Sequence, residues 1–498
     1  MNPLKKLAGQ TAIYGLSSII GRFLNFLLIP LYTHVLPEHE YGVVTEMYTY
    51  LALLIIILTY GMETAYFRFS ESTLDKKKVY ATALTSLILT SLIFLVSAVM
   101  FSSQIAAVLG YPDNTEYVVW FAMIIAFDAI SAIPFAKLRS ENKATAFATI
   151  KLVNISINIG LNLLFILAAP HLFSETLGFN GLFLGPRAGV GYIFIANLVA
   201  SSATLLLLFI WSGQIRIGID LHIWKEMLVY ALPLLILGVA GSINETLDRL
   251  MLKYRLPLDF ESRMAAVGVY GACYKLAMIL TLFVQSFRYA AEPFYFSHEK
   301  EKDALKTYAN IMTYFSAVCG LIFLAIMVYM DIVKTLIGER YHVGLKVVPI
   351  ILLANVFLGF FYNLSIWYKL RKKTFTGAMI TVCGAAITIV GNYFWIPAYG
   401  YMASAWVTLV CYMSMAFLSY WIGKKHLPVP YHLPKVIGYI ILALGLYYLN
   451  GFMPEMPFWM AQIANTFFIF VYLLAVISTN PELLEKLKTL RRPQHDKN

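Results

Sequence analysis

Three ionisable residues lie together in one of the most apolar parts of the chain. Glu245, Asp248 and Arg249 belong to the stretch GSINETLDRLML, which follows LVYALPLLILGVA and is soon followed by VGVYGACYKLAMILTLF. A charged side chain facing lipid costs roughly 3 kcal/mol or more, so such residues usually face a bundle interior or a water-filled cavity. The pattern therefore predicts a polar site inside a membrane.

The spacing of these residues leaves two interpretations of Arg249 open. Glu245 precedes it by four residues, so the two side chains can form an ion pair along one helix face with a purely structural role. Asp248 is adjacent to Arg249, and adjacent residues project about 100° apart on a helix, which is poor geometry for a pair. In the second interpretation Arg249 faces a cavity and binds an anion.

No set of residues with catalytic spacing accompanies these charges. The chain has no HExxH, no GxxxxGK[ST] and no nucleophile elbow, and its nine histidines fall in expected loops or at span ends. The four cysteines, Cys273, Cys319, Cys383 and Cys411, form no CxxC pair, which argues against a disulfide framework or a zinc site. No expected loop is long enough for a catalytic domain, so we expect neither an enzyme nor a metal site.

The apolar runs that hold the charges dominate the chain. Of its 498 residues, 60% are hydrophobic and 13% are charged, whereas a soluble domain carries about 25% charged residues. Apolar runs of about 20 residues are long enough to cross a membrane as helices. The net charge of +11 comes from basic residues in short loops, where they set membrane topology and do not indicate nucleic acid binding. We expect an all-α polytopic membrane protein.

The runs predict about fourteen transmembrane helices. They cover residues 11–33, 42–65, 79–103, 115–137, 146–169, 189–212, 230–257, 264–292, 306–330, 343–368, 375–396, 401–422, 433–451 and 456–478. Lys and Arg are concentrated in alternate loops, for example at 76–78 and 369–373, and the positive-inside rule places these loops and both termini in the cytoplasm.

Both ends of the chain carry interpretable signals. The opening MNPLKKLAGQ precedes a long span without a small-residue cleavage signature, which predicts a retained anchor. In the tail 481–498, leucines at 483, 484, 487 and 490 share one helical face, so the tail is either a basic amphipathic helix on the inner leaflet or a solvated extension.

An internal repeat organises the spans. Arg22 matches Arg249 and Pro30 matches Pro257 at an offset of 227 residues, and Tyr41-Gly42 matches Tyr270-Gly271 at 229. Other matches are Glu63 with Glu292, Tyr66-Phe67 with Tyr295-Phe296, and Lys137-Leu138-Arg139 with Lys369-Leu370-Arg371. We therefore expect two parallel six-helix halves, 1–220 and 221–426, followed by two extra helices at 427–480 and the tail 481–498. A substrate site is expected at the interface of the halves.

The remaining charges in the expected spans fall on few helices. They are Arg22, Glu46, Glu63, Asp128, Lys151, Lys275, Arg288, Glu292 and Lys346. Most lie in the first, second, seventh and eighth spans, which we expect to line a wet cavity with help from the fourth and fifth.

The charged residues of the first, second and eighth spans have different expected partners. Arg22 has no carboxylate one turn away, so it needs an anionic substrate or a partner such as Glu46 or Asp128. Glu46 and Lys275 are repeat equivalents of opposite charge and form either a gate or two separate sites.

Charges near the span ends are expected to be interfacial. Glu63 and Glu292 should form ion pairs near Arg68 and Arg288 at the inner helix ends. Lys253 lies near an outer end, where a long side chain can reach water.

Two stretches resemble a known family. LPLLILGVAGSINETLDRLML with VGVYGACYKLA resembles the central signature of the polysaccharide transporter family, with its Pro, its Asp-Arg pair and the Tyr that opens the next helix. PLYTHVLPEHEYGVVTEMYTY resembles that family's region between the first two helices, centred on Tyr41-Gly42. The resemblance covers nearly the whole chain and extends to the multidrug, oligosaccharidyl-lipid and polysaccharide exporter superfamily.

The resemblance implies a flippase in a bacterial cytoplasmic membrane. Its substrate would be an oligosaccharide repeat unit on undecaprenyl pyrophosphate, for O-antigen, capsule or exopolysaccharide, with membrane lipid around it and with polymerase and glycosyltransferases of the pathway as partners. Arg22, Arg249 and Lys275 would suit the diphosphate, because guanidinium groups bind phosphate oxygens in pairs.

The expected mechanism is alternating access without a cofactor. Glu46, Asp128, Glu245 and Asp248 are the carboxylates that would carry a coupling H⁺ or Na⁺ or act in gating. A lipid II flippase is the nearest alternative, and a multidrug or cation exporter of the same superfamily is another. A membrane-embedded polymerase or ligase would need a large outer loop, which is not expected here.

Overall fold

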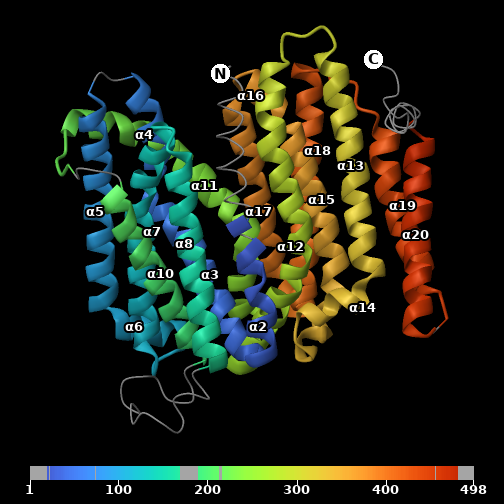
Figure 1. The fold of residues 1–498 in the computed structure, drawn as a ribbon, viewed down its shortest axis with the longest axis horizontal. Coiled ribbons are helices and arrows are strands. Elements are labelled where there is room, and N and C mark those ends of the chain that lie inside the picture. The colour runs from blue at the N-terminus through green and yellow to red at the C-terminus, as the bar shows by residue number, and fades with distance from the viewer. Residues whose placement is uncertain are drawn as a thin grey trace, which may run out of the picture. The chain divides into compact units, whose positions relative to one another are not determined.

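The structure is a computed structural model that describes residues 20–21, 23–72, 75–168, 189–211, 216–454 and 456–480. Every element in these ranges is a helix (Figure 1). In this part of the chain, 13 helices are long and apolar enough to cross a membrane, and a shorter apolar helix, Phe23–Val35, lies in the first expected span. The expected all-α polytopic fold is confirmed. Arg22 and the tail 481–498 lie outside the described residues.

The described helices form two compact units. Unit 1 comprises residues 1–275, 337–347 and 378–411, and unit 2 comprises 276–336, 348–377 and 412–498. The division of the sequence at 220 and 426 into repeated halves stays a prediction.

Unit 1 contains most of the charged positions described above. Its elements are α2 (Leu28–Val35), α3 (Glu38–Thr59), α4 (Met62–Ser72), α5 (Lys76–Met100), α6 (Ser102–Leu109), α7 (Thr115–Ser140), α8 (Ala144–Leu163), the π-helical turn η1 (Leu164–Ala168), α10 (Gly189–Trp211), α11 (Leu221–Arg255), the first part of α12 (Phe260–Ser297), η3 (Glu339–Val347), and parts of α17 (Thr374–Tyr399) and α18 (Tyr401–His426).

Unit 2 holds the rest of α12 and the C-terminal helices. Its other elements are α13 (Ala304–Val328), α14 (Met330–Val333), η2 (Lys334–Leu336), α15 (Val348–Leu364), α16 (Ile366–Leu370), the rest of α17 and α18, α19 (Leu433–Gly451) and α20 (Phe458–Ser478).

Local sequence signals set the ends of α11, the helix that carries the central charges. The Asp220 carboxylate accepts hydrogen bonds from the backbone N–H groups of His222 and Ile223, at 3.0 and 3.2 Å. This N-cap satisfies donors that a helix start leaves open, and α11 therefore begins nine residues before the expected start at 230. It ends at Arg255 because Leu256 precedes Pro257 and adopts an extended conformation.

Two glycines let α3 and α12 touch through their main chains. A methyl group on Gly42 would overlap the carbonyl oxygen of Met264, and one on Gly268 would overlap the carbonyl oxygen of Glu38. Small residues of this kind allow helices in membranes to approach closely. Because Gly42 belongs to the repeated Tyr-Gly pair, the repeat coincides with a crossing of helices from the two expected halves.

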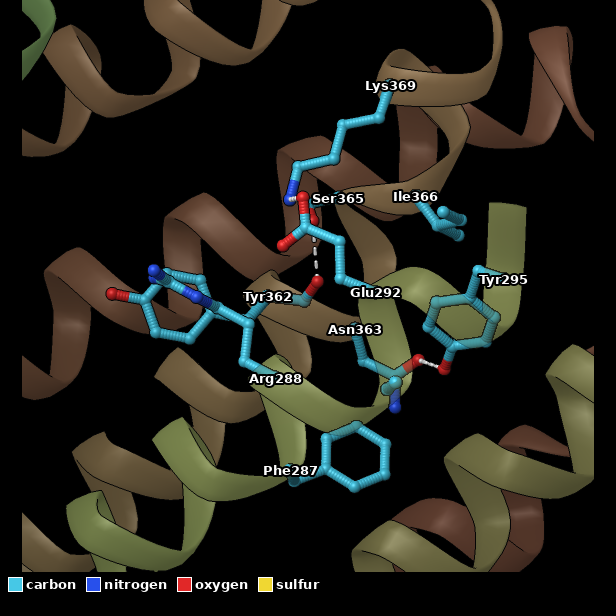
Figure 2. A pocket seen from close by; sticks show the side chains of 10 residues that line it. Phe287, Arg288, Glu292, Tyr295, Tyr362, Asn363, Ser365, Ile366 and Lys369 are labelled. Carbon is cyan, nitrogen blue, oxygen red and sulfur yellow. Dashed lines mark hydrogen bonds and ion pairs between the residues drawn. The ribbon is translucent and has the colours of Figure 1, made fainter. Parts of the chain in front are cut away.

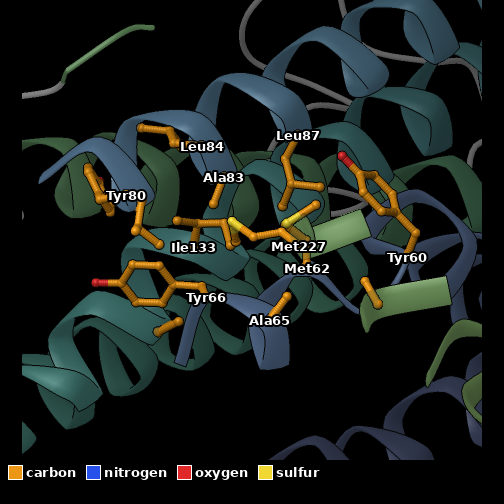
Figure 3. Close-up of a cluster of buried hydrophobic side chains, with 13 residues drawn as sticks. Tyr60, Met62, Ala65, Tyr66, Tyr80, Ala83, Leu84, Leu87, Ile133 and Met227 are labelled. Atoms are coloured by element: carbon orange, nitrogen blue, oxygen red, sulfur yellow. The ribbon is translucent and has the colours of Figure 1, made fainter. Parts of the chain in front are cut away.

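A buried apolar cluster fixes α4, α5, α7 and α11 against one another (Figure 3). Its members are Tyr60, Met62, Ala65, Tyr66, Val79, Tyr80, Ala83, Leu84, Leu87, Ile133, Ala136, Met227 and Ala231. Tyr66 and Tyr80 lie at one end of the cluster and Tyr60 lies at the other. Dense packing of this kind gives the side chains at its ends a rigid support.

Matching turns occur in the two units. Asn142 follows α7 and Lys372 follows α16, and both have left-handed backbones, with φ of 58° and 56°. The amide of Asn142 bonds the carbonyl of Arg139, and that of Lys372 bonds the carbonyl of Lys369. The turns therefore align Arg139 with Lys369, two residues away from the alignment that the shared Lys-Leu-Arg letters predict.

Ion pairs follow the same alignment. Glu63 pairs with Arg139, and Glu292 pairs with Lys369 at 2.8 Å in a small pocket of unit 2 (Figure 2). The expected interfacial pairs exist, but their partners differ from the expected Arg68 and Arg288. Those arginines instead lie over aromatic rings, at 4.3 Å from the Tyr230 centroid and 4.8 Å from the Tyr362 centroid.

Candidate functional site

The central charges of α11 form a closed polar cluster with α12. Asp248 and Arg249 are 2% and 8% exposed. One carboxylate oxygen of Asp248 lies 3.4 Å from Arg249 Nη1, and the other accepts a hydrogen bond of 2.6 Å from the Tyr270 hydroxyl. Asp248 and Arg249 therefore do pair, although they are adjacent, because the guanidinium folds back along its own helix.

The guanidinium of Arg249 is held on two further sides. Its Nη1 donates to the main-chain carbonyl of Glu245 at 2.6 Å, and its carbon lies 4.1 Å from the ring centroid of Tyr274. Side chains on a helix lean toward its N-terminus, which brings Arg249 over the preceding turn.

The expected carboxylate pair of Glu245 with Arg249 is replaced by this main-chain contact. The Glu245 side chain is exposed in the structure, whereas Asp248 is buried beside the guanidinium. Asp248 is therefore the counter-ion of Arg249.

A second buried ion pair connects α11 to α3. Lys253 Nζ donates to the Glu46 carboxylate at 2.5 Å and to the Leu109 carbonyl at 2.6 Å. The Tyr111 hydroxyl donates to the other oxygen of Glu46 at 2.5 Å. Glu46 is 0% exposed and Lys253 is 3% exposed, so this network is completely enclosed by unit 1.

The position of Lys253 corrects the expectation that its side chain reaches toward water at the outer end. The carboxylate of Glu46 and the carbonyl of Leu109 satisfy its ammonium inside the protein. Paired charges can be buried where isolated ones cannot. Tyr111 lies between α6 and α7, where burial and the Glu46 carboxylate raise the pKa of its hydroxyl far above the ordinary value, so it remains a donor.

The other expected residues are Asp128 on α7, Lys275 on α12, and Arg22, which lies outside the described residues. Asp128 of α7 lies near Ser201 of α10 and Lys151 of α8. Lys275 is half-buried on α12, one residue after Tyr274. The pairing of Glu46 with Lys275 stays a prediction, as does the role of Arg22.

Four participants were not singled out as site residues from the sequence: Lys253, Tyr111, Tyr270 and Tyr274. Lys253 follows Arg249 by four residues and so shares its helix face, which is a usable signal. Tyr270 was visible in the repeated Tyr-Gly pair. Tyr111 sits in a loop far from Glu46 in sequence, and no local pattern indicates its contact.

Comparison with known proteins places the chain in a family. The model of a family described as polysaccharide biosynthesis protein matches residues 7–298. The chain belongs to this family. A search of curated protein sequences finds no match. The polysaccharide biosynthesis family thus accounts for more than half of the chain, including α3, α11 and α12.

Solved structures of transporters share the fold of this family member. The lipid II flippase MurJ, in an inward closed conformation, is 16% identical with a TM-score of 0.67, covering 95% of this chain and 99% of that one. An inward-facing multidrug resistance MATE family transporter of the MOP superfamily is 14% identical with a TM-score of 0.61, covering 86% and 95%. The family match agrees with the expected part in polysaccharide biosynthesis, and the solved structures show the expected multi-pass helical fold.

Proposed function

We propose that this protein flips oligosaccharide repeat units linked to undecaprenyl pyrophosphate across a bacterial cytoplasmic membrane, with both termini in the cytoplasm. The product would feed O-antigen, capsule or exopolysaccharide assembly by a polymerase. One observation carries the proposal: a buried arginine, Arg249, is paired with Asp248 in the part of the chain that matches the polysaccharide biosynthesis family. A diphosphate headgroup needs such a cation on its path, because hydrocarbon cannot solvate it.

Asp248 and the diphosphate compete for the same guanidinium in this mechanism. While Asp248 is ionised it neutralises Arg249, at 3.4 Å. A proton on Asp248 removes that counter-charge and leaves the guanidinium for phosphate oxygens. Proton uptake and substrate binding are thereby coupled at adjacent residues. Lys275 on α12 supplies additional positive charge, and Arg22 enters the proposal from the sequence repeat alone.

In this proposal the Glu46–Lys253 pair and the glycine crossing close the outer end of the transport pathway. The pair connects α3 with α11, and Gly42 brings α3 against α12. Each contact joins a helix of the first expected half to a helix of the second. Alternating access requires that both contacts separate when the substrate leaves toward the outside.

Substitution of Arg249 tests the proposal in a strain that depends on this chain for its surface polysaccharide. We expect Arg249→Ala to abolish the polysaccharide while the protein remains in the membrane, and Arg249→Lys to restore only part of it, since Lys lacks the forked geometry. Arg255→Ala is the matched control, because Arg255 lies on the same helix but stacks on Tyr393 at 4.0 Å. Full polysaccharide production by Arg249→Ala would refute the assignment.

A lipid II flippase is the second candidate, because the MurJ structure matches 95% of the chain. Rescue of growth in cells depleted of their lipid II flippase would favour it over the first proposal. An exporter of organic cations is less well supported, since the buried carboxylates of Asp248 and Glu46 are each neutralised by a cation.

A further inference from the structure

A basic pocket lies in unit 1, away from the charges of α11. It has a volume of about 440 Å³, which is within the range of about 300–1,000 Å³ typical of small-molecule sites. Helices α4, α5 and α7 and the segment before α11 form its walls. The lining residues are Tyr66, Ser70, Glu71, Lys76, Lys77, Tyr80, Lys137, Ser140, Glu141 and Arg216.

The pocket lining carries excess positive charge. Its four cations are Lys76, Lys77, Lys137 and Arg216, and its two carboxylates are Glu71 and Glu141. Glu141 is also bound by Lys143, at 2.7 Å, which adds a further cation beside the lining. The electrostatic balance of the pocket therefore favours an anion.

Rigid groups hold one wall of the pocket in place. Tyr66 and Tyr80 belong to the buried apolar cluster and lie at the same end of it (Figure 3). The Lys137 ammonium lies 4.5 Å from the Tyr80 ring centroid, and the Ser140 hydroxyl donates to the Lys137 carbonyl at 2.9 Å. A cation that is positioned in this way loses little freedom when a ligand binds.

The position of the pocket selects the kind of anion. It adjoins the Lys-rich start of α5 and the turn after α7, which the positive-inside rule assigns to the cytoplasmic face. Clusters of Lys and Arg at this level of a membrane attract phosphate-bearing headgroups. Lysine ammonium groups also bind phosphate as point charges, and the arginine can bind two oxygens at once.

We propose that this pocket binds a phosphate-bearing anion at the inner face of the membrane, supplied either by a lipid headgroup or by a soluble diphosphate. The site goes beyond the proposed transport function, because it does not include the charges of α11. It would anchor α4, α5 and α7 to the membrane surface or hold a phosphate ligand beside them.

Binding to the purified full chain tests the proposal without a transport assay. The probes are inorganic pyrophosphate, dioctanoyl phosphatidic acid and, as a zwitterionic comparison, dioctanoyl phosphatidylcholine, with dissociation constants measured by thermophoresis. The pocket variant is Lys76→Gln/Lys77→Gln/Arg216→Gln. The matched control is Lys300→Gln/Lys302→Gln/Lys306→Gln, which removes the same charge from exposed positions in the loop after α12 and in the first turn of α13.

We expect the pocket variant to bind phosphatidic acid about tenfold more weakly or worse, because each basic residue at a membrane surface contributes separately, and the control to change by less than about twofold. If the pocket variant loses affinity for pyrophosphate as strongly as for phosphatidic acid, the pocket is a site for soluble anions. If it loses affinity for phosphatidic acid alone, the pocket is a lipid headgroup site. Equal binding by both variants, or no binding of either anion by the unmodified chain, overturns the proposal. Arg216→Glu alone, in an exposed segment, repeats the test if the triple variant does not fold.

Discussion

Neutralising one partner of the Glu46–Lys253 pair should be far more harmful than neutralising both. In Glu46→Gln the Lys253 ammonium keeps the Leu109 carbonyl but loses its counter-ion in a site where the two side chains are 0% and 4% exposed. Leaving a buried charge uncompensated costs about 3–5 kcal/mol, or roughly a hundredfold to several thousandfold in a folding or closing equilibrium. Lys253→Met leaves the Glu46 carboxylate with the Tyr111 hydroxyl and should cost a similar amount.

The double variant Glu46→Gln/Lys253→Met separates this explanation from a loss of packing. Gln keeps the shape of Glu46 and can still accept the bond from Tyr111, and Met fills the space of the lysine stem. Because no charge remains, the double variant should be more stable than the sum of the single effects by at least about 1.5 kcal/mol, within the range found for residues in contact.

Thermal unfolding of the three purified variants measures this coupling, and surface polysaccharide in the dependent strain measures its consequence. The double variant should unfold at a higher temperature than either single variant. If instead the two single effects simply add, the ion pair is not the reason that these residues matter, and the role assigned to them in closing the outer side fails with it.

Three further predictions concern the helices around this pair. Gly42→Ala should lower the unfolding temperature, because the added methyl group forces α3 away from the Met264 carbonyl. Gly241→Ala is the control and should leave that temperature unchanged, since a methyl group there meets nothing within 4 Å. Equal unfolding temperatures for the two variants would contradict the close contact of α3 with α12. Tyr270→Phe should destabilise the protein by about 1–3 kcal/mol, since it removes the donor to a buried carboxylate of α11, and an unchanged melting curve would count against that bond. Asp220→Ala should cost about 1 kcal/mol through loss of the helix cap, whereas Asp220→Ser should cost much less in the same unfolding measurement.

The spans were predictable because their signal is a property of composition over about 20 residues. Helix α11 shows the limit of this signal, since hydropathy alone places its start at 230 and misses the capped polar turns after Asp220. The repeat was also visible in the sequence. However, the identical residues align Lys137 with Lys369, whereas the left-handed turns at Asn142 and Lys372 align Arg139 with Lys369, a difference of two residues.

The site was predictable only in part, for a physical reason. The cost of placing Asp248 and Arg249 in a membrane marks them as important from the sequence, but it does not identify their partners. Partner choice depends on which helices pack together, and the contact between Glu46 and Lys253 spans 207 residues of chain. Tyr111 was missed for the same reason, because its loop meets Glu46 only after α3, α7 and α11 have packed.

The crossing of α3 and α12 has a consequence for how a lipid could enter or leave sideways. Gly42 and Gly268 place two main chains so near to each other that even one methyl group does not fit between them. A prenyl chain carries such methyl groups along its whole length. For the lipid-linked substrate proposed above, the crossing in this conformation would be a barrier to lateral passage, and the tail would follow another path around these helices or wait until they part.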